Sequence, residues 1–386
     1  MSTRFLIIGS GFSGSVLANR LLQNLDCTID IWDEREHAGG NCHTERDGET
    51  GIMVHQYGPH IFNTDKKEIW DYVNNFGTFK NYVHRVKAMS GGKIYSLPIN
   101  LLTINHFFNK AFTPREAKIF LEGLADNSII NPGNFEEQAL HFIGKELYAA
   151  FFYGYTKKQW GCEPSALPAS ILKRIPVRFD YDDNYHLNEY TGIPAEGYSS
   201  IMQKMVNDKR ISISLNRKFI PGTDTKEYTH VFYTGPLDFY FNYEYGRLGY
   251  RTVIFDKHSE KGTYQGVAQM NYCDEAIPYT RIVEHKFFAP WEKHDKTIYV
   301  KEYSKETMAQ DIPYYPKRLN ADKILLHQYR QKAEGLNAVS FLGRLATYRY
   351  MDMHHVIGEA LALADTFSTC FKNNMPLPIF PNKENG

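Results

Sequence analysis

Three glycines near the start of the chain, Gly9, Gly11 and Gly14, form a GxGxxG turn. In such a turn the first glycine allows a tight bend, the second lets the backbone approach a pyrophosphate, and the third allows close helix–strand packing. Asp33 follows Gly14 by 19 residues, the spacing at which an acid accepts a hydrogen bond from a ribose hydroxyl. The motif therefore predicts a dinucleotide at the positive end of a helix.

The elements that must position this motif follow from the apolar pattern around it. Residues 5–8 form a short apolar run that predicts a buried strand, and apolar residues recur at helical spacing over 16–22. Residues 28–32 predict the second strand, which ends at Asp33. Strand, turn, helix and strand in this order are the context in which a GxGxxG motif is informative. Arg35, just beyond, is interpreted as a solvated surface side chain rather than a ligand of a 2′-phosphate.

A pair of glycines past the second strand favours FAD over NAD. Gly39 and Gly40 are followed by Asn41, and the backbone of such a pair passes close to an extended flavin cofactor. Residues 341–344 predict a strand end near the other terminus, and residues 353–363 predict a helix that follows it. The alternative is an ordinary βα unit. We predict FAD held from both ends of the chain, by Gly9, Gly11, Ser13, Gly14, Asp33, Gly40, Asn41, Gly343 and Arg344.

Composition limits the remaining classes of protein. A chain of 386 residues suggests two or three domains. Lys and Arg total 44, as do Asp and Glu, which argues against a nucleic-acid binder held by bulk charge. Five scattered cysteines predict neither a disulfide framework nor a metal site. Glycines interrupt the apolar run after Arg4, and no run approaches a membrane span of about 18 residues, so we expect a cytoplasmic protein.

The rest of the pattern predicts two insertions in a dinucleotide-binding core. Residues 101–174 are helical in pattern, with Thr113 as the cap of one helix and Asn134 as the cap of another. The apolar face predicted for the second helix is Phe135, Ala139, Phe142, Ile143, Leu147, Ala150 and Phe151. Residues 243–303 contain short β-type runs. The predicted fold is α/β, an FAD-binding Rossmann-like core with a helical insertion domain and an antiparallel β-sheet domain.

The predicted domain boundaries make the core discontinuous. The FAD-binding domain takes residues 1–78, 196–242 and 318–386, and the helical substrate domain takes residues 98–195. The antiparallel sheet domain takes residues 79–97 and 243–317.

Longer strings of residues are more specific than the glycine motif. They run in order along nearly the whole chain: 57–62 (YGPHIF), 96–100 (SLPIN), 154–161 (GYTKKQWG), 167–169 (LPA), 173–179 (KRIPVRF), 278–281 (PYTR) and 313–316 (PYYP). In these strings the chain resembles the bacterial UDP-galactopyranose mutases, flavoenzymes that interconvert UDP-galactopyranose and UDP-galactofuranose.

The resemblance implies a reaction without net oxidation. The reduced flavin N5 attacks the anomeric carbon, UDP leaves, a covalent flavin–sugar adduct forms, and the sugar recloses in the other ring size. An external electron donor then only primes the flavin. The resemblance also implies a homodimer.

The resemblance further assigns site residues. Arg174 and Arg281 would grip the diphosphate, His60 would face the flavin, and residues 167–188 would form a mobile lid. A uridine site would be made by Phe151, Phe152, Tyr155 and Trp160, hydroxyl donors to the phosphates by Tyr185, Tyr315 and Tyr350, a sugar contact by Asn271, and contacts to the ribityl and phosphate region of the flavin by Asp352 and Met353. By spacing alone Phe151 would be core.

Two residues depart from the family pattern and leave the hexose preference open. Asn63 stands where His is expected, and His84 where Asn is expected. Two other classes share the glycine motif. A flavin oxidoreductase of the amine-oxidase type would oxidise its substrate and need no diphosphate clamp, and a non-enzymatic protein like the GDP-dissociation inhibitors would use the fold to bind protein. Paired arginines with an aromatic wall favour the mutase.

Overall fold

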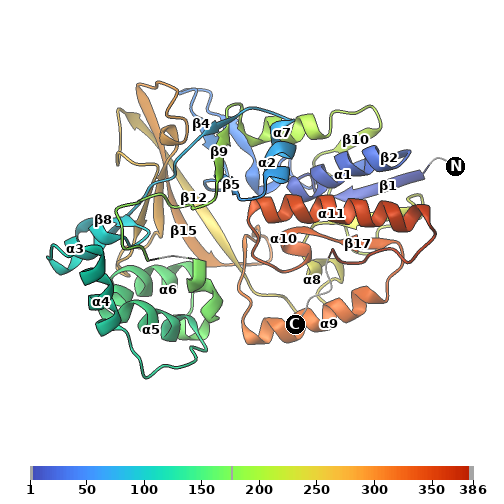
Figure 1. Ribbon diagram of the computed structural model, residues 1–386. Coiled ribbons are helices and arrows are strands. Elements are labelled where there is room, and N and C mark those ends of the chain that lie inside the picture. The colour runs from blue at the N-terminus through green and yellow to red at the C-terminus, as the bar shows by residue number, and fades with distance from the viewer. Residues whose placement is uncertain (1–2, 175–176, 382–386) are drawn as a thin grey trace.

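A five-stranded parallel sheet forms one end of the molecule (Figure 1). The computed structural model describes residues 3–174 and 177–381, apart from the side chains of Ser170, Lys173 and Arg174. The strand order is β10 (Ile211–Ser214), β2 (Cys27–Trp32), β1 (Thr3–Ile8), β11 (His230–Tyr233) and β17 (Val339–Phe341). Ile8 is in register with both Trp32 and Tyr233, so β1, β2 and β11 end at the same edge of the sheet.

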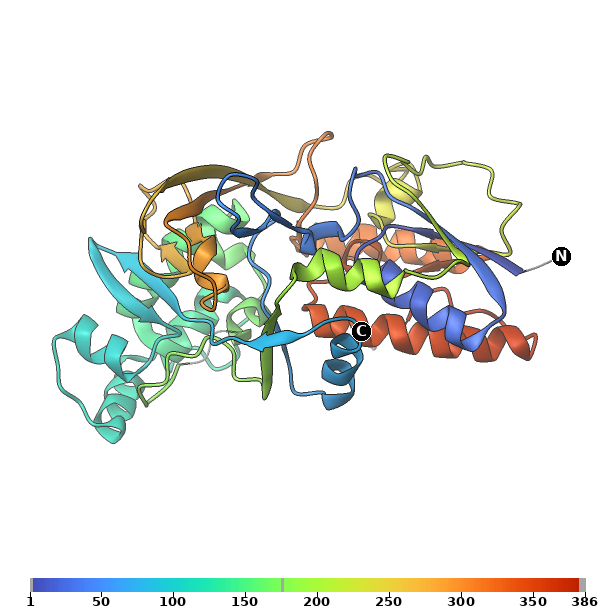
Figure 2. The ribbon, with the colours of Figure 1, turned by 90° about the horizontal axis from the view of Figure 1, so that it is seen from above.

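Helices cover both faces of this sheet. Phe5 and Ile7 of β1 face one core, which includes α1 (Phe12–Asn24) and α11 (Met353–Lys372), two helices that lie side by side in Figures 1 and 2. Leu6 and Ile8 point to the opposite core, because successive strand residues alternate between faces. Other helices of this part are α2 (Lys67–Asn74), α7 (Gly197–Met205), α8 (Leu237–Tyr240), α9 (Asn320–Glu334) and α10 (Gly343–Ala346).

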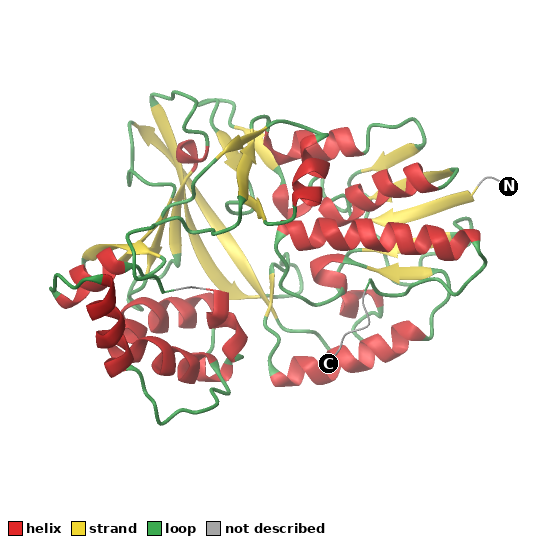
Figure 3. Cartoon of the chain, viewed as in Figure 1, coloured by secondary structure: helices red, strands yellow, loops and turns green. Residues whose placement is uncertain are grey.

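A seven-stranded mixed sheet forms the middle of the molecule, with its long strands running between two groups of helices (Figure 3). The order is β16 (Tyr315–Pro316), β12 (Tyr250–Lys261), β15 (Lys296–Glu306), β14 (Arg281–Glu284), β13 (Gln269–Tyr272), β7 (Val86–Ser90) and β8 (Lys93–Leu97). All neighbouring pairs are antiparallel except β13 and β7, which are parallel.

The second group of helices packs on β7 and β8. It contains α3 (Leu101–Phe108), α4 (Pro114–Leu124), α5 (Phe135–Leu147), a π-helical turn (Tyr148–Tyr153) and α6 (Gly154–Trp160), followed by single 3₁₀ turns at Pro164–Ala166 and Ala169–Arg174. Small sheets join the two groups: β3 (Thr44–Arg46) with β4 (Met53–His55), and β5 (Phe62–Thr64), β9 (Tyr190–Pro194) and β6 (Phe79–Asn81). Further 3₁₀ turns span Gly40–Cys42 and His285–Phe288.

The predicted fold class is confirmed, and several details differ from the sequence pattern. Both predicted helix caps form: Thr113 makes a capping box with Glu116, and Asn134 accepts from the Glu137 amide. Phe142, however, is 49% exposed. Successive residues of an α-helix are offset by about 100° around its axis. The buried apolar stripe of α5 has its centre near Ala139 and Ile143, so Phe142 lies at the edge of that stripe.

The strands of the central sheet also differ from expectation. The sequence pattern predicts only short strands over residues 243–303. Two of the strands there are long: β12 has 12 residues and β15 has 11. The parallel β13–β7 pair makes the sheet mixed rather than antiparallel throughout. β9 belongs to the predicted helical part but pairs with β5 and β6, and the predicted domain boundaries stay a prediction.

Candidate functional site

One large cavity, with a volume of about 1100 Å³, runs from the glycine turn to helix α6 and strands β13 and β14. Ligand pockets commonly measure about 300–1000 Å³, so the cavity is large enough for a dinucleotide and a second ligand. It is lined by residues of the parallel sheet, of the mixed sheet and of the helical part. Of the residues predicted for the site, those that line it are Gly9, Gly11, Ser13, Asp33, Gly40, Asn41, His60, Phe151, Phe152, Tyr155, Trp160, Tyr185, Asn271, Arg281, Tyr315, Arg344, Tyr350, Asp352 and Met353.

The glycine turn has the geometry that its motif predicts. Gly9 has φ of 104°, a region that favours glycine, and a Cβ on Gly14 would lie 2.0 Å from the Gly9 carbonyl oxygen. Gly14 therefore allows α1 to pack closely against the end of β1 and lies behind the cavity wall. At Gly11 an added Cβ would meet only backbone atoms of Gly40, at an ordinary 3.7 Å. The protein itself therefore leaves room for a side chain at Gly11. A ligand in close contact with the backbone at this position would take up that room.

Asp33 is held rigidly at the end of β2. Its Oδ2 accepts from the Ser10 amide at 2.8 Å and from the Ser10 hydroxyl at 2.7 Å, and its Oδ1 accepts from the Arg35 amide at 3.0 Å. The residue is buried and lines the cavity. These three bonds orient a carboxylate toward the position where a ribose of a bound dinucleotide would lie.

The interpretation of Arg35 as a solvated side chain is wrong. Its guanidinium lies 4.4 Å from the centre of the Tyr57 ring and donates to Asn41 Oδ1 at 2.7 Å. Its Nη1 is buried and has no hydrogen-bond partner among the described residues. Arg35 lines the cavity together with Gly39 and Gly40. A buried donor without a partner is costly, so this position suits an anionic ligand.

From the other terminus, residues of the β17–α11 connection close the same part of the cavity. Gly343 packs against the Ser13 side chain behind the wall, and Arg344 donates to the Tyr314 carbonyl oxygen at 3.1 Å. The Arg344 guanidinium lies over the Tyr350 ring, 4.9 Å from its centre. The two ends of the chain thus meet at the cavity, as the sequence predicts.

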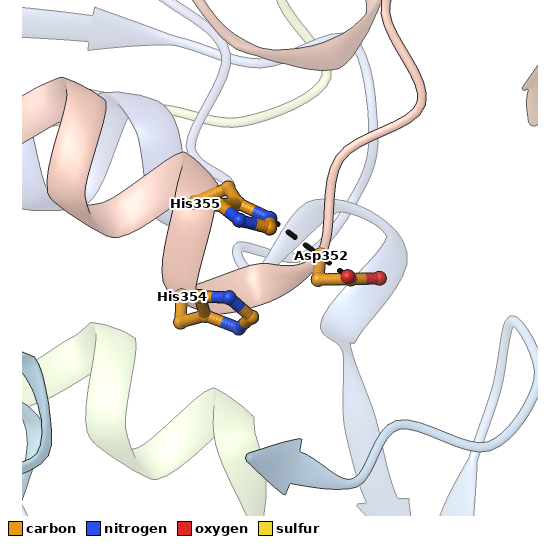
Figure 4. Close-up of side chains that lie close together, drawn as sticks. All are labelled: Asp352, His354 and His355. Atoms are coloured by element: carbon orange, nitrogen blue, oxygen red, sulfur yellow. Dashed lines mark ion pairs between the residues drawn. The ribbon is translucent and has the colours of Figure 1, made fainter. Parts of the chain in front are cut away.

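Asp352, His354 and His355 form a side-chain cluster at the start of α11 (Figure 4). Their possible ligand atoms all lie within 4.8 Å of one another, and His355 Nδ1 is 3.8 Å from Asp352 Oδ2. Asp352 and His355 are about half exposed. Asp352 is the N-cap of α11, and the positive end of a helix disfavours a cation. The electrostatic field of α11 therefore disfavours a cation at this place.

At the far end of the cavity, Arg281 of β14 is held by a buried carboxylate. Its Nε donates to Glu302 Oε2 at 2.6 Å, and the Glu302 side chain is 3% exposed. Burial alone would lower the pKa of Arg281, but the charge and hydrogen bond of Glu302, together with Tyr315 and Tyr155, raise that pKa above its ordinary value. The guanidinium is therefore a permanent, oriented cation, with its terminal nitrogens available to an anion.

Aromatic rings form a wall beside Arg281. The Trp160 and Tyr315 ring centres are 6.5 Å apart, and Tyr315 stacks on Tyr350 at 5.8 Å. Phe151 is 4% exposed and belongs to the core of the helical part, yet it also lines the cavity. The core position inferred from spacing and the cavity position implied by resemblance therefore both hold for Phe151. Burial raises the pKa of Tyr155, so its hydroxyl stays protonated.

The histidines of the cavity are neutral at physiological pH. Burial lowers the pKa of His60 to about 4 and that of His84 to about 3. His60 Nδ1 lies 2.8 Å from the Gly58 carbonyl oxygen, which can only accept, so the proton of the neutral ring is on Nδ1. Nε2 of His60 then carries the lone pair.

Two buried polar residues of β13 lie beside Arg281 of the neighbouring strand β14. Gln269 and Asn271, two residues apart, share one face of the strand, and Gln269 Nε2 donates to Asn271 Oδ1 at 2.9 Å. His84, one of the two departures from the family pattern, lines the same region, and its carbonyl oxygen accepts from the Tyr185 amide at 2.8 Å. Asn63, the other departure, also lines the cavity.

The predicted lid is described only in part. The Arg174 side chain and residues 175–176 lie outside the described residues. Beyond them, the Arg178 amide donates to Ile99 O, and Leu101 donates to Asp180 O, both at 2.9 Å. Residues 178–180 are therefore held by backbone hydrogen bonds against residues 99–101.

The cavity residues that sequence reasoning missed include Arg35, Tyr57, Gln269 and Tyr314. Tyr57 and Tyr314 stand inside strings quoted for the resemblance, and Gln269 is two positions from Asn271 on a strand, a spacing that could have identified it. Arg35 carried no comparable signal, because its exposure depends on the fold around it.

The fold and the cavity define a dinucleotide-binding, Rossmann-like protein with room for a second, anionic ligand. A model of the NAD(P)-binding Rossmann-like domain matches residues 7–76, and a model of the UDP-galactopyranose mutases matches residues 150–350. The chain is 52% identical to a probable UDP-galactopyranose mutase of Klebsiella pneumoniae, over 97% of each chain. It belongs to the UDP-galactopyranose mutase family, as the resemblance indicated.

Other comparisons refine this placement. The chain is 48% identical to a dTDP-fucopyranose mutase of Escherichia coli, over 96% of this chain and 99% of the relative. A crystal structure of a reduced UDP-galactopyranose mutase matches with a TM-score of 0.73 at 15% identity, covering 94% of this chain and 95% of the other. A putative protoporphyrinogen oxidase of Exiguobacterium matches with a TM-score of 0.65 at 12% identity, covering 96% of this chain and 99% of the other. Such a likeness shows the fold alone and does not favour the oxidoreductase alternative.

No helix among the described residues is both long and apolar enough to cross a membrane. The expected cytoplasmic location and the expected homodimer stay predictions.

Proposed function

We propose that this chain interconverts UDP-galactopyranose and UDP-galactofuranose with the help of a bound flavin. The observation that carries the proposal is one cavity with a dinucleotide turn at one end and an oriented cation with an aromatic wall at the other. Family membership supports the substrate class, since relatives that share most of the chain are named as nucleotide-sugar mutases.

The residues at the first end fit a flavin dinucleotide. Gly11 leaves room for a pyrophosphate, the Asp33 carboxylate is oriented for a ribose, and Arg35 Nη1 is a buried donor with no hydrogen-bond partner in the described part of the chain. Gly9, Ser13, Gly40 and Asn41 would complete the site of the adenosine diphosphate half, and Arg344, Asp352 and Met353 would hold the ribityl side. When bound and reduced, the flavin supplies the nucleophile that displaces the nucleotide from the sugar.

The chain's own residues would hold the substrate in place for this step. Arg281 would bind the diphosphate and keep the leaving nucleotide in the cavity, because its charge is permanent and Glu302 fixes its direction. The uracil ring would be bounded by Phe151, Phe152, Tyr155 and Trp160, which line the cavity. Burial raises the pKa values of Tyr185 and Tyr315, so their hydroxyl groups keep their protons and would donate to phosphate oxygens, as would that of Tyr350. Arg174 is proposed as a second cation on the lid.

The test is turnover of the FAD-loaded protein in both redox states. We expect dithionite-reduced protein to convert UDP-galactofuranose to the pyranose, and oxidised protein to do so far more slowly. Equal rates in both states would contradict a role for reduced flavin. Running dTDP-fucopyranose beside UDP-galactopyranose distinguishes the two mutase substrates of the relatives, and oxygen consumption in step with turnover would instead indicate an oxidase.

A further inference from the structure

Two adjacent lysines of helix α6, Lys157 and Lys158, have opposite surroundings. The Lys157 ammonium makes surface ion pairs with Glu163 at 2.9 Å and Glu275 at 3.0 Å. The Lys158 ammonium points inward and donates to backbone carbonyl oxygens only. Those oxygens belong to Tyr272 at 2.8 Å, Asp274 at 2.9 Å, Ile277 at 2.9 Å and Tyr279 at 3.1 Å.

Three of these carbonyls belong to the loop that joins β13 to β14, and the fourth is that of Tyr272, the last residue of β13. An ammonium has three N–H groups, so four acceptors share three donors and converge on one point. Burial lowers the pKa of Lys158 to about 8, so the amine is still mostly protonated at pH 7. The loop therefore folds around a charge that α6 supplies.

A second contact joins the same two elements. Gly154 lies one helical turn before Lys158, on the same face of α6. A Cβ at Gly154 would lie 2.3 Å from the Cys273 carbonyl oxygen. The helix and the loop therefore approach more closely than any larger side chain would permit. Gly154 and Lys158, four residues apart, thus form the face of α6 that contacts this loop.

The two joined elements carry the two halves of the nucleotide site. Helix α6 carries Tyr155 and Trp160. The loop ends at Arg281, whose Cα is in register with Asn271 of the neighbouring strand. Arg251 holds the other end of the helix, with Nε donating to the Gln159 carbonyl oxygen at 3.0 Å.

We propose that Lys158 is a positioning residue that sets the separation between Tyr155 and Trp160, the part of the aromatic wall that α6 carries, and the Arg281 guanidinium on β14. The inference rests on the proposed function, in which the wall holds a base and Arg281 holds the attached diphosphate. A ligand that spans both halves needs this separation to match its own length. A ligand that contacts only the cation does not.

The experiment compares two probes on FAD-loaded protein by isothermal titration calorimetry: UDP, which would span both halves, and inorganic pyrophosphate, which would contact only the cation. For Lys158→Met we expect the Kd of UDP to rise at least tenfold and that of pyrophosphate to change less than threefold, with FAD retained. Lys157→Met, the matched control, should bind UDP within twofold of wild type. Lys158→Arg should recover part of the UDP affinity.

Gly154→Ala provides an independent test, because it pushes the loop away while leaving the ammonium in place. We expect the same selective loss of UDP affinity, and this variant replaces Lys158→Met if the latter does not fold. Unchanged UDP binding in Lys158→Met, or an equal loss of both probes, would overturn the positioning role. Wild-type protein that does not bind UDP would instead contradict the proposed function, so the two failures are distinguishable.

Discussion

Replacing Arg281 should reveal two separate effects of one side chain, on stability and on nucleotide binding. In Arg281→Met the Glu302 carboxyl, on a side chain that is 3% exposed, loses its only ion-pair partner in the described structure. Removing one partner of a buried pair typically costs about 3–5 kcal/mol of folding free energy. Burial raises the pKa of Glu302, so the carboxyl can take up a proton. We therefore expect a loss near the lower end, about 3 kcal/mol.

The double variant Arg281→Met with Glu302→Gln separates the two effects. It leaves no buried charge, so we expect its free energy of unfolding to return to within about 1–2 kcal/mol of wild type. The nucleotide site still lacks its cation. A charge-assisted hydrogen bond contributes about 1.5–3 kcal/mol, so UDP affinity should stay roughly 10- to 150-fold below wild type.

The assay pairs urea unfolding with calorimetric titration of UDP, and the flavin absorbance of each purified variant serves as the control for cofactor retention. The single variant should be weakened in both measurements and the double variant in binding alone. If the double variant bound UDP like wild type, Arg281 would not be the phosphate-binding cation. If the single variant were as stable as wild type, Glu302 would not depend on it.

Two further outcomes follow from the structure. Gly14→Ala places a Cβ 2.0 Å from the Gly9 carbonyl oxygen, so the purified variant should lose stability and flavin. The control Gly123→Ala, whose Cβ would have no atom within 4 Å, should keep both. A fully flavin-loaded Gly14→Ala protein would refute the packing argument. The melting temperature should fall as the pH drops from about 6.5 to 5, because the unfolded chain binds protons that His60 and His84, with pKa values lowered by burial to about 4 and about 3, do not. Each ring accounts for up to about 2 kcal/mol at pH 5, and an unchanged melting temperature there would mean that the folded protein also binds these protons.

Local signals in the sequence were sufficient where a short segment determines its own structure. The strand, glycine turn and helix over residues 3–24 follow from apolar spacing and from the steric freedom of Gly9. The capping box at Thr113 and the cap at Asn134 are likewise local hydrogen bonds between residues three apart. Such features do not depend on the rest of the fold, so a single sequence predicts them.

The sequence pattern did not predict contacts between segments that are far apart in the chain. Nothing near Arg35 indicates that Tyr57 and Asn41 enclose its guanidinium, and the adjacent Lys157 and Lys158 are indistinguishable by type and spacing. The parallel pairing of β13 with β7 is also a long-range event, since about 180 residues separate the two strands.

The sequence by itself determined that the chain has a GxGxxG turn between a strand and a helix, an acid at the end of the second strand, and strings of residues shared with a mutase family. Only the tertiary structure decided which cations are buried, which carboxylate orients Arg281, and which carbonyls surround Lys158. The physical reason is that desolvation and ion pairing depend on what lies within a few ångströms in space. Those neighbours are brought together by sheets and loops whose members are distant in sequence.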